Sequence, residues 1–231
     1  MNLVITGNSN NNTNNNGERP KRSGHMMKIQ GEYPIERIIR IGRNNGIQQV
    51  FCIINSKEPE LKHWLSTYNS EIPLKFIEKN GESPISSLFA LVPFLPKEPF
   101  FLINTNSVFI ESEFSEFITY SLLQKDADGI LAVTRYIDDT KPLRVAMNDE
   151  DIILKFSDSM DGYSWANGGI YYFSSRAFDE AKYALQAGIS GLENFLKLLI
   201  VKGYTLKGFS FSKIVNIKNA GDIARAEELI L

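Results

Sequence analysis

The sequence predicts an α/β protein in which a mostly parallel central sheet is covered by helices on both faces, with a small antiparallel addition in the second half. Residues 1–125 alternate four times between a short apolar run and a segment with helical spacing. Near-continuous apolar strands joined by helices are typical of parallel sheets that are buried on both faces. Between residues 129 and 156, three apolar runs follow one another without room for helices, which indicates antiparallel strands.

The first half of the chain carries clear start and stop signals. Pro34 suits the first turn of a helix, and Gly42 and Gly46 end the helical pattern that follows it. Apolar stripes at helical spacing predict the later helices in the same way. We expect strands over 3–6, 49–54, 74–78 and 100–104, and helices over 34–41, 58–68, 83–91 and 111–125.

The second half begins with the three runs read as antiparallel additions, over 129–134, 143–147 and 152–156. Further strands are expected over 168–173, 206–211 and 214–217, and helices over 175–187, 191–202 and 220–231. The chain has no internal repeat and no linker rich in Pro, Gly or Ser. We therefore expect a single domain over residues 1–231.

Composition narrows the classes of partner. The formal net charge is −2 and charged residues of both signs are mixed along the chain, so we expect neither nucleic acid nor a membrane surface as partner.

The single cysteine, Cys52, lies in an apolar run and is interpreted as a buried small hydrophobic residue. No run approaches the roughly 20 apolar residues of a membrane span, and the N-terminus lacks a signal-peptide pattern, so we expect a cytoplasmic protein.

Ligands of open α/β sheets bind beyond the carboxyl ends of the strands. In this sequence those positions are rich in amides and poor in carboxylates, and the loop after Gly7 is almost entirely asparagine. A dinucleotide-binding fingerprint requires further glycines in this loop and an acidic residue after the second strand, where Asn55 stands. The sequence therefore argues against a dinucleotide-dependent dehydrogenase.

The order of segments resembles the sugar-1-phosphate nucleotidyltransferases, which have a GT-A-like fold. Residues 3–7 resemble the opening strand and glycine of that family, residues 29–36 its "I-x-G-x-P-L-I-E" helix entry, and residues 45–47 its "AGI". Residues 101–109 resemble the metal-binding "N-x-D-x-x-F" stretch, 127–135 "GADATLAVT", 165–173 "VNAGIYVF", and 214–218 with Asp222 the terminal "W-x-D-I-x-T-x-x-D". The resemblance covers nearly the whole chain.

The resemblance implies a reaction in which a sugar 1-phosphate attacks the α-phosphate of a nucleoside triphosphate and pyrophosphate leaves. It implies nucleotide contacts at Gly7, Asn8, Ser9, Gly81 and Ser83, and sugar contacts at Asn167, Gly168 and Asp158. It places the loop lysine at Lys21 or at His25, and the two magnesium ligands at Asn106 and Asn216. Because both expected aspartates are asparagines, a conventional Mg²⁺ site is in doubt. The sugar-phosphate "E-K-P" element of the family maps to residues 158–160, which contain no lysine.

Several of these positions also have plainer interpretations. Ser83 with Pro84 is equally what ordinary helix capping would select, and Asn167–Gly168 is equally a bulge before a strand. Lys218 lies two residues after Asn216, hence on the same face of an expected strand, where its ammonium group would replace the metal charge. The alternative is a solvated lysine at a strand end.

Two functions remain open from the sequence. The first is an active nucleotidyltransferase with Lys21 and Lys218 as catalytic residues. The second is a catalytically inactive relative that binds nucleotide or sugar phosphate, or pairs as a regulatory subunit with a paralogous chain or with another copy of itself. A glycosyltransferase is a weaker third, because Asn104-Thr105-Asn106 stands where its D-x-D motif would be.

Overall fold

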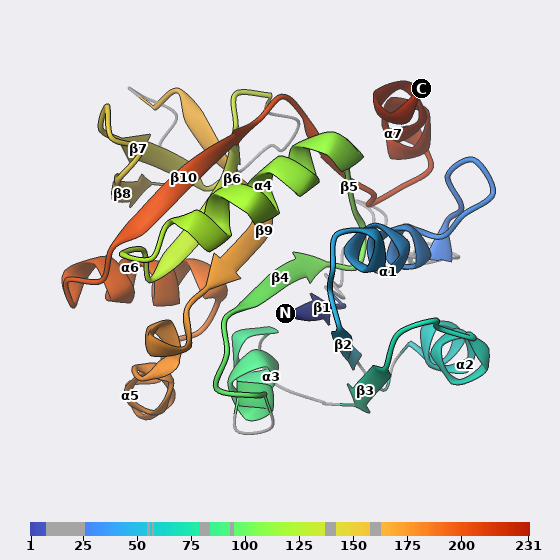
Figure 1. The fold of residues 1–231 in the computed structure, drawn as a ribbon, viewed down its shortest axis with the longest axis horizontal. Coiled ribbons are helices and arrows are strands. Elements are labelled where there is room, and N and C mark those ends of the chain that lie inside the picture. Colours follow the sequence, from blue (N-terminus) through green and yellow to red (C-terminus); the bar gives the residue numbers. More distant parts are fainter. Residues whose placement is uncertain are drawn as a thin grey trace, which may run out of the picture.

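The structure is a computed structural model of the 231-residue chain, and it describes residues 1–7, 26–54, 56, 58–78, 84–92, 95–136, 142–157 and 163–231. A nine-stranded sheet contains most of its strands, with seven in the order β10-β6-β9-β4-β1-β2-β3 and the hairpin β7–β8 joined to β9 (Figure 1). In the first half, the strands are β1 (Asn2–Thr6), β2 (Gln49–Ile54), β3 (Leu74–Glu78), β4 (Phe100–Asn104) and β5 (Ser107–Phe109). The second half has β6 (Gly129–Thr134), β7 (Arg144–Met147), β8 (Ile153–Ser157), β9 (Trp165–Phe173), β10 (Leu206–Phe211) and β11 (Ile214–Asn216).

Strand direction confirms the predicted fold class and corrects one assignment. β1, β2, β3 and β4 are mutually parallel, whereas β9 runs antiparallel to both β4 and β6. Since β6 is antiparallel to β9 and parallel to β10, β6 points in the same direction as the first four strands. Reading residues 129–134 as an antiparallel addition was therefore wrong, because the reversed member of the sheet is β9. The β7–β8 hairpin is the antiparallel addition.

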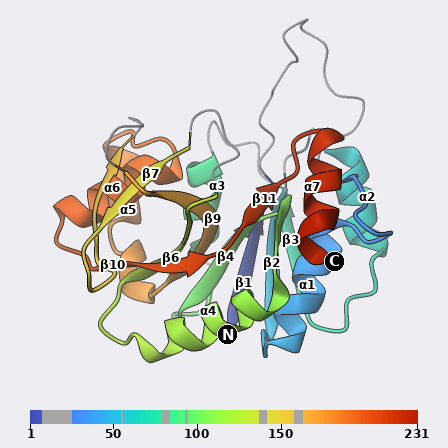
Figure 2. The same ribbon diagram turned by 90° about the horizontal axis from the view of Figure 1, so that it is seen from above.

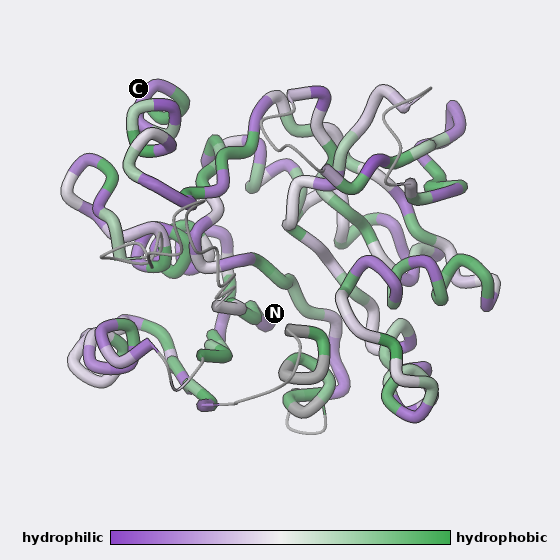
Figure 3. Tube along the Cα trace, turned by 180° about the vertical axis from the view of Figure 1, so that it is seen from behind, coloured by the Kyte–Doolittle hydropathy of each residue, from purple (hydrophilic) through white to green (hydrophobic). Residues whose placement is uncertain are grey.

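Helices cover both faces of the sheet. Figure 2 shows α1 (Pro34–Asn44) and α4 (Glu111–Leu123) on one side, and α3 (Pro84–Leu91), α5 (Ala181–Gln186) and α6 (Leu192–Val201) on the other. Apolar residues of α1, α4 and α2 (Pro59–Thr67) share one buried cluster, and those of α3, α5 and α6 share a second. The outer helices in Figure 3 alternate between hydrophobic and hydrophilic residues, as expected for helices that pack on one face.

Core burial explains why β1, β2 and β4 were readable from sequence. Leu3, Val4 and Ile5 are fully buried, and consecutive residues of β1 contribute to opposite clusters because side chains alternate across a strand. Cys52 lies in the same core, and burial raises the pKa of its thiol to about 12. The reading of Cys52 as a buried small hydrophobe is confirmed.

A small separate unit lies beside the main sheet. β5 and β11 pair antiparallel, and Val108, Val215 and Ile217 pack with Ile29 and with Ala226 of α7 (Gly221–Ile230). Figure 2 places α7 next to β11 and α1. We call this unit the β5–β11–α7 clasp. The sequence did not predict β5, because a three-residue strand has too few side chains to show alternation.

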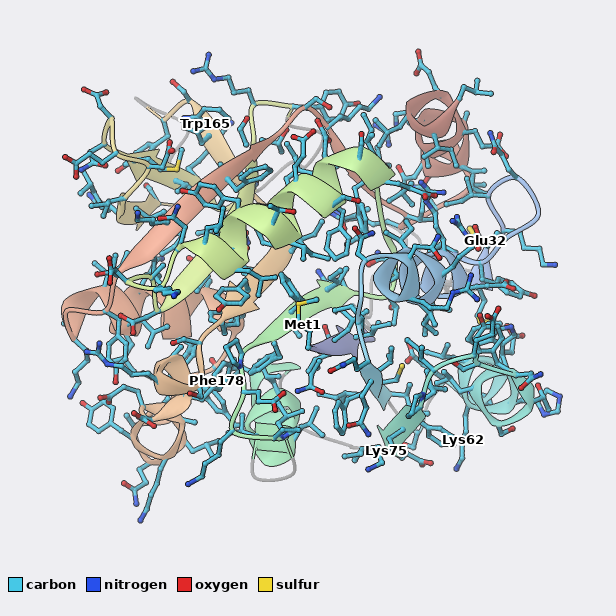
Figure 4. The ribbon with its side chains drawn as sticks, in the orientation of Figure 1. Met1, Glu32, Lys62, Lys75, Trp165 and Phe178 are labelled. Atoms are coloured by element: carbon cyan, nitrogen blue, oxygen red, sulfur yellow. The ribbon has the colours of Figure 1, made fainter. Side chains whose placement is uncertain are left out.

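Figure 4 shows the side chains at the two ends of the sheet. Trp165 lies at the β7–β9 corner, whereas Lys62 and Lys75 lie by α2 and β3 at the other end of the sheet. Glu32 lies beside α1 and pairs with Arg40 at 2.9 Å. In the described ranges, no helix combines the length and the apolar character needed to cross a membrane.

Candidate functional site

The candidate site lies at the edge of the sheet where β1, β2 and β4 end. Because β9 runs in the opposite direction, it begins at this same edge, and Gly169 of β9 comes against Asn104 of β4. The sequence predicted a strand that begins at Gly168, with Asn167 directly before it. They lie inside β9, which begins at Trp165, so they reach the expected edge through strand reversal.

Gly7 is fixed between two neighbours. Its N–H donates to Ile53 O at 2.9 Å, and a Cβ added at Gly7 would lie 3.0 Å from Glu58 Oε2. A side chain at this position would therefore crowd the Glu58 carboxylate, which would have to shift. Because the Gly7 N–H already donates to Ile53 O, it is not available to donate a hydrogen bond to a phosphate group.

Asn106 and Asn216, the expected metal ligands, both lie in the β5–β11–α7 clasp. Asn106 Nδ2 donates to Ile217 O at 2.8 Å, and Ser107 Oγ donates to Asn216 Oδ1 at 2.9 Å. The backbone adds a bond of 2.9 Å from Ile217 N to Asn106 O. The two amides thus hold β5 to β11.

These contacts test whether the residues suit a magnesium ion. Mg²⁺ prefers oxygen ligands with anionic charge, because neutral ligands offset its dehydration poorly. The Asn216 oxygen already accepts a hydrogen bond, both side chains are neutral, and the described residues contain no group of three or more His, Cys, Asp or Glu side chains able to hold a metal. In the described part of the chain, Asn106 and Asn216 therefore do not have the chemistry of a conventional magnesium site.

Lys218 is exposed and lies two residues beyond Asn216, the last residue of β11. Alternation along a strand therefore does not fix which way the Lys218 side chain points, so this basis for placing its ammonium group fails. Its backbone N–H donates to Asp222 Oδ2 at 2.7 Å, and that of Asn219 donates to the same oxygen at 2.9 Å. Asp222 is buried and also pairs with Arg225. It anchors the entry to α7.

Asn167 is held within its own strand. Its Nδ2 donates to the Tyr171 hydroxyl at 2.6 Å, and its Oδ1 accepts from Gly169 N at 3.3 Å. Burial raises the pKa of Tyr171 to about 12, so this hydroxyl stays protonated. The pairing of β9 with β6 is irregular between Leu131 and Val133, at the level of Gly168 and Gly169. Asn167 thus stabilises a bulge, as the plainer interpretation expected.

Gly168 and Gly169 are required at this bulge for different reasons. A Cβ at Gly168 would lie 2.3 Å from Ile214 Cδ1 and 3.1 Å from Ala132 O. Gly169 has φ +78°, a left-handed conformation that favours glycine. The bulge therefore brings bare backbone to the sheet edge.

Thr6 and Asn104 form a contact that the sequence did not single out. Thr6 Oγ1 donates to Asn104 Oδ1 at 3.1 Å across the parallel pair β1–β4. From the sequence, Asn104 was noted after a strand and as the first residue of the segment compared with a D-x-D motif, and Thr6 only as part of the first strand. The available signal was a hydroxyl residue directly before Gly7, opposite a strand that ends in an amide.

The other predicted site residues lie outside the described residues. They are Asn8, Ser9, Lys21, Gly81, Ser83 and Asp158, together with His25. The roles expected for them stay predictions. Of the described ones, the sheet edge gathers Gly7, Asn167 and Gly168, whereas Asn106, Asn216 and Lys218 belong to the clasp and its exit.

This architecture is the fold of the sugar-phosphate nucleotidyltransferases. The inositol-1-phosphate CTP transferase from T. maritima superimposes with a TM-score of 0.77 at 16% identity, over 100% of this chain and 97% of that one. HddC from Yersinia pseudotuberculosis gives 0.73 at 15% identity over 98% of both chains, and its complex with GMP-PN gives 0.72. A Bacillus anthracis protein assigned as a glucose-1-phosphate thymidylyltransferase, in complex with sucrose, gives 0.77 at 14% identity, over 99% and 94%.

Sequence comparison adds no closer relationship. No protein-family model matches the chain, and no curated protein matches it. At identities of 14–16%, the structural likeness establishes the fold alone. The resemblance in fold that the sequence motifs indicated is confirmed.

Proposed function

We propose that this protein binds a nucleoside triphosphate and a sugar 1-phosphate at the carboxyl edge of the sheet and transfers the nucleotidyl group between them. The observation that carries this proposal is the end-to-end likeness to nucleotidyltransferases, which includes 97% of the inositol-1-phosphate CTP transferase chain. In the reaction, a phosphate oxygen of the sugar phosphate bonds to the α-phosphorus. The bond from that phosphorus to the β-phosphate bridging oxygen breaks, and pyrophosphate leaves.

Without a magnesium ion at Asn106 and Asn216, side chains of the protein would have to offset the negative charge of the phosphate groups. Phosphoryl transfer depends mainly on positioning and on neutralising phosphate charge. The cationic candidates of this chain are Lys21 and Lys218, which we propose as the catalytic residues. Asn106 and Asn216 then act as a neutral support for the edge rather than as metal ligands.

A second function is favoured by the same amides. Two positions where the related fold is expected to carry carboxylates instead carry asparagines that are used as structural hydrogen-bonding groups. This favours a protein that binds nucleotide or sugar phosphate without transferring it. Such a protein would act as a sensor or as the regulatory subunit of a paralogous enzyme or of its own oligomer.

One experiment separates the two functions. Calorimetry with CTP, GTP, dTTP and glucose 1-phosphate, each in magnesium and in EDTA, is followed by a pyrophosphate-release assay on every pair containing a bound nucleotide. Turnover that persists in EDTA and is lost in Lys21→Ala or Lys218→Ala supports the enzyme. Binding without pyrophosphate release supports the second function, and binding abolished by EDTA contradicts the metal-independent site.

A further inference from the structure

We propose that Asn104 is a ligand-binding residue of this edge, and that Thr6 orients its amide so that Nδ2 donates to an oxygen atom of the nucleotide. The proposal rests on the proposed function and names the group at the centre of the site that recognises the ligand. Asn104 ends β4, between Thr6 of β1 and Gly169 of β9.

The first step is the orientation of the amide. Thr6 Oγ1 donates to Asn104 Oδ1 at 3.1 Å, so the oxygen of the amide faces Thr6 and the NH₂ group faces the other way. Thr6 is 9% exposed, which limits the freedom of its hydroxyl. The NH₂ group, which faces away from Thr6, can only donate hydrogen bonds.

The second step is the surroundings of that donor. A Cβ built on Gly169 would lie 3.1 Å from Asn104 Nδ2, so Nδ2 lies against the backbone of the β9 bulge, where glycine carries no side chain. Within the described residues, no carbonyl or carboxylate accepts a hydrogen bond from Nδ2. Asn104 is half-buried, and a polar group at this depth gains from a partner that a ligand supplies.

The third step is the place of this pair in the fold. Gly7, where the nucleotide loop begins, follows Thr6 directly, and α3 packs on the face to which Thr6 and Asn104 point by alternation with Val4 and Leu102. A ligand bound beside Gly7 on this face of the sheet therefore comes next to Asn104. Because Nδ2 only donates, it selects oxygens that accept, which are phosphate oxygens or base carbonyl oxygens.

The test uses isosteric variants of the full chain. Asn104→Asp keeps the acceptor for Thr6 but replaces the donor by a carboxylate, so the affinity for CTP, GTP or dTTP measured by calorimetry should fall at least about 10-fold. Thr6→Val removes the orienting hydroxyl at nearly constant volume and should weaken binding about 3- to 10-fold, whereas Thr6→Ser should restore it. Exposed Asn69→Asp makes the same change of charge away from the site and should bind as wild type.

Two further probes identify the oxygen. Loss of inorganic pyrophosphate binding in Asn104→Asp assigns a phosphate oxygen, and loss of cytidine or thymidine binding assigns a base carbonyl. Thermal unfolding of each variant separates a stability effect from a binding effect, because a purely structural Thr6–Asn104 bond would shift unfolding and leave affinity unchanged. Asn104→Asp with wild-type affinity overturns this inference and leaves the proposed function intact. A wild-type protein that binds none of the nucleotides overturns both.

Discussion

At the scale of single residues, asparagine side chains serve as hydrogen-bonding groups in the described part of the candidate site and the clasp. Asn106 and Asn216 tie β5 to β11, and Asn167 supports the bulge of β9 through Tyr171. An amide both donates and accepts, so it satisfies backbone groups at a sheet edge without the desolvation cost of a carboxylate. The asparagines are therefore accounted for as hydrogen-bonding groups of the scaffold.

A substitution at Asn106 tests this assignment. In Asn106→Asp, a carboxylate faces Ile217 O in place of the NH₂ donor 2.8 Å away, so the free energy of unfolding at pH 7 should fall by about 1–3 kcal/mol. Urea denaturation measures the change, and Asn69→Asp is the matched control. A variant as stable as wild type would show that the Asn106 amide does not hold the clasp.

At the scale of elements, the β5–β11–α7 clasp is held together beside the main sheet by few residues. Its strands are short, and α7 adds the apolar contact of Ala226. The chain leaves β11 through Lys218 and Asn219, and both of their N–H groups are bound by one carboxylate oxygen of Asp222. An acidic residue in the first turn is favourable for a helix because of the partial positive charge at its N-terminus.

Asp222 should therefore control the attachment of α7. Removing the side chain in Asp222→Ala leaves two N–H groups without their acceptor and should lower stability by about 2 kcal/mol. Asp222→Asn keeps one acceptor oxygen and should lose less. Chemical denaturation followed by circular dichroism measures both variants, and equal losses in the two would contradict the role given to the acceptor oxygen.

At the scale of the whole molecule, a charged network joins elements far apart in the chain. Glu111, at the start of α4, pairs with Arg37 and Arg40 of α1, each at 2.9 Å. Arg37 also donates to Phe109 O at 3.3 Å, which links α1 to the end of β5. The hydrogen bond from Arg40, followed by the nearby charge of Arg37, holds the pKa of Glu111 below its ordinary value of 4.5.

This lowered pKa predicts a pH dependence of stability. A carboxyl group with a depressed folded pKa stabilises the protein above its unfolded pKa, and the contribution is lost as pH falls below 4.5 through the folded pKa. Glu111→Gln should be less stable than wild type at pH 7, by less than about 1 kcal/mol because the side chain is 41% exposed. The difference should shrink as the pH is lowered.

Thermal unfolding from pH 7 to pH 3 measures this convergence. Glu116→Gln, on the same helix, is the control, because in the described part of the chain Glu116 forms no ion pair. A constant difference between Glu111→Gln and wild type across this range would contradict the assignment.

Apart from β5, the sequence by itself determined which described segments contain strands and which contain helices. The expected strands over 49–54, 74–78, 100–104, 129–134 and 206–211 have the bounds that the structure gives them. This is because apolar periodicity and helix signals act within about ten residues of chain. The same reasoning predicted the carboxyl edge as the candidate site, since the ends of parallel strands meet there.

Only the tertiary structure determined which of these segments lie next to one another. The reversal of β9 brings Gly169 against Asn104, and the Thr6–Asn104 bond joins residues 98 positions apart. Strand order and direction depend on pairing between distant segments, and the local pattern of a strand does not specify its partner. For that reason the sequence predicted the sheet edge as the candidate site, whereas the contact between Thr6 and the Asn104 amide is visible only in the fold.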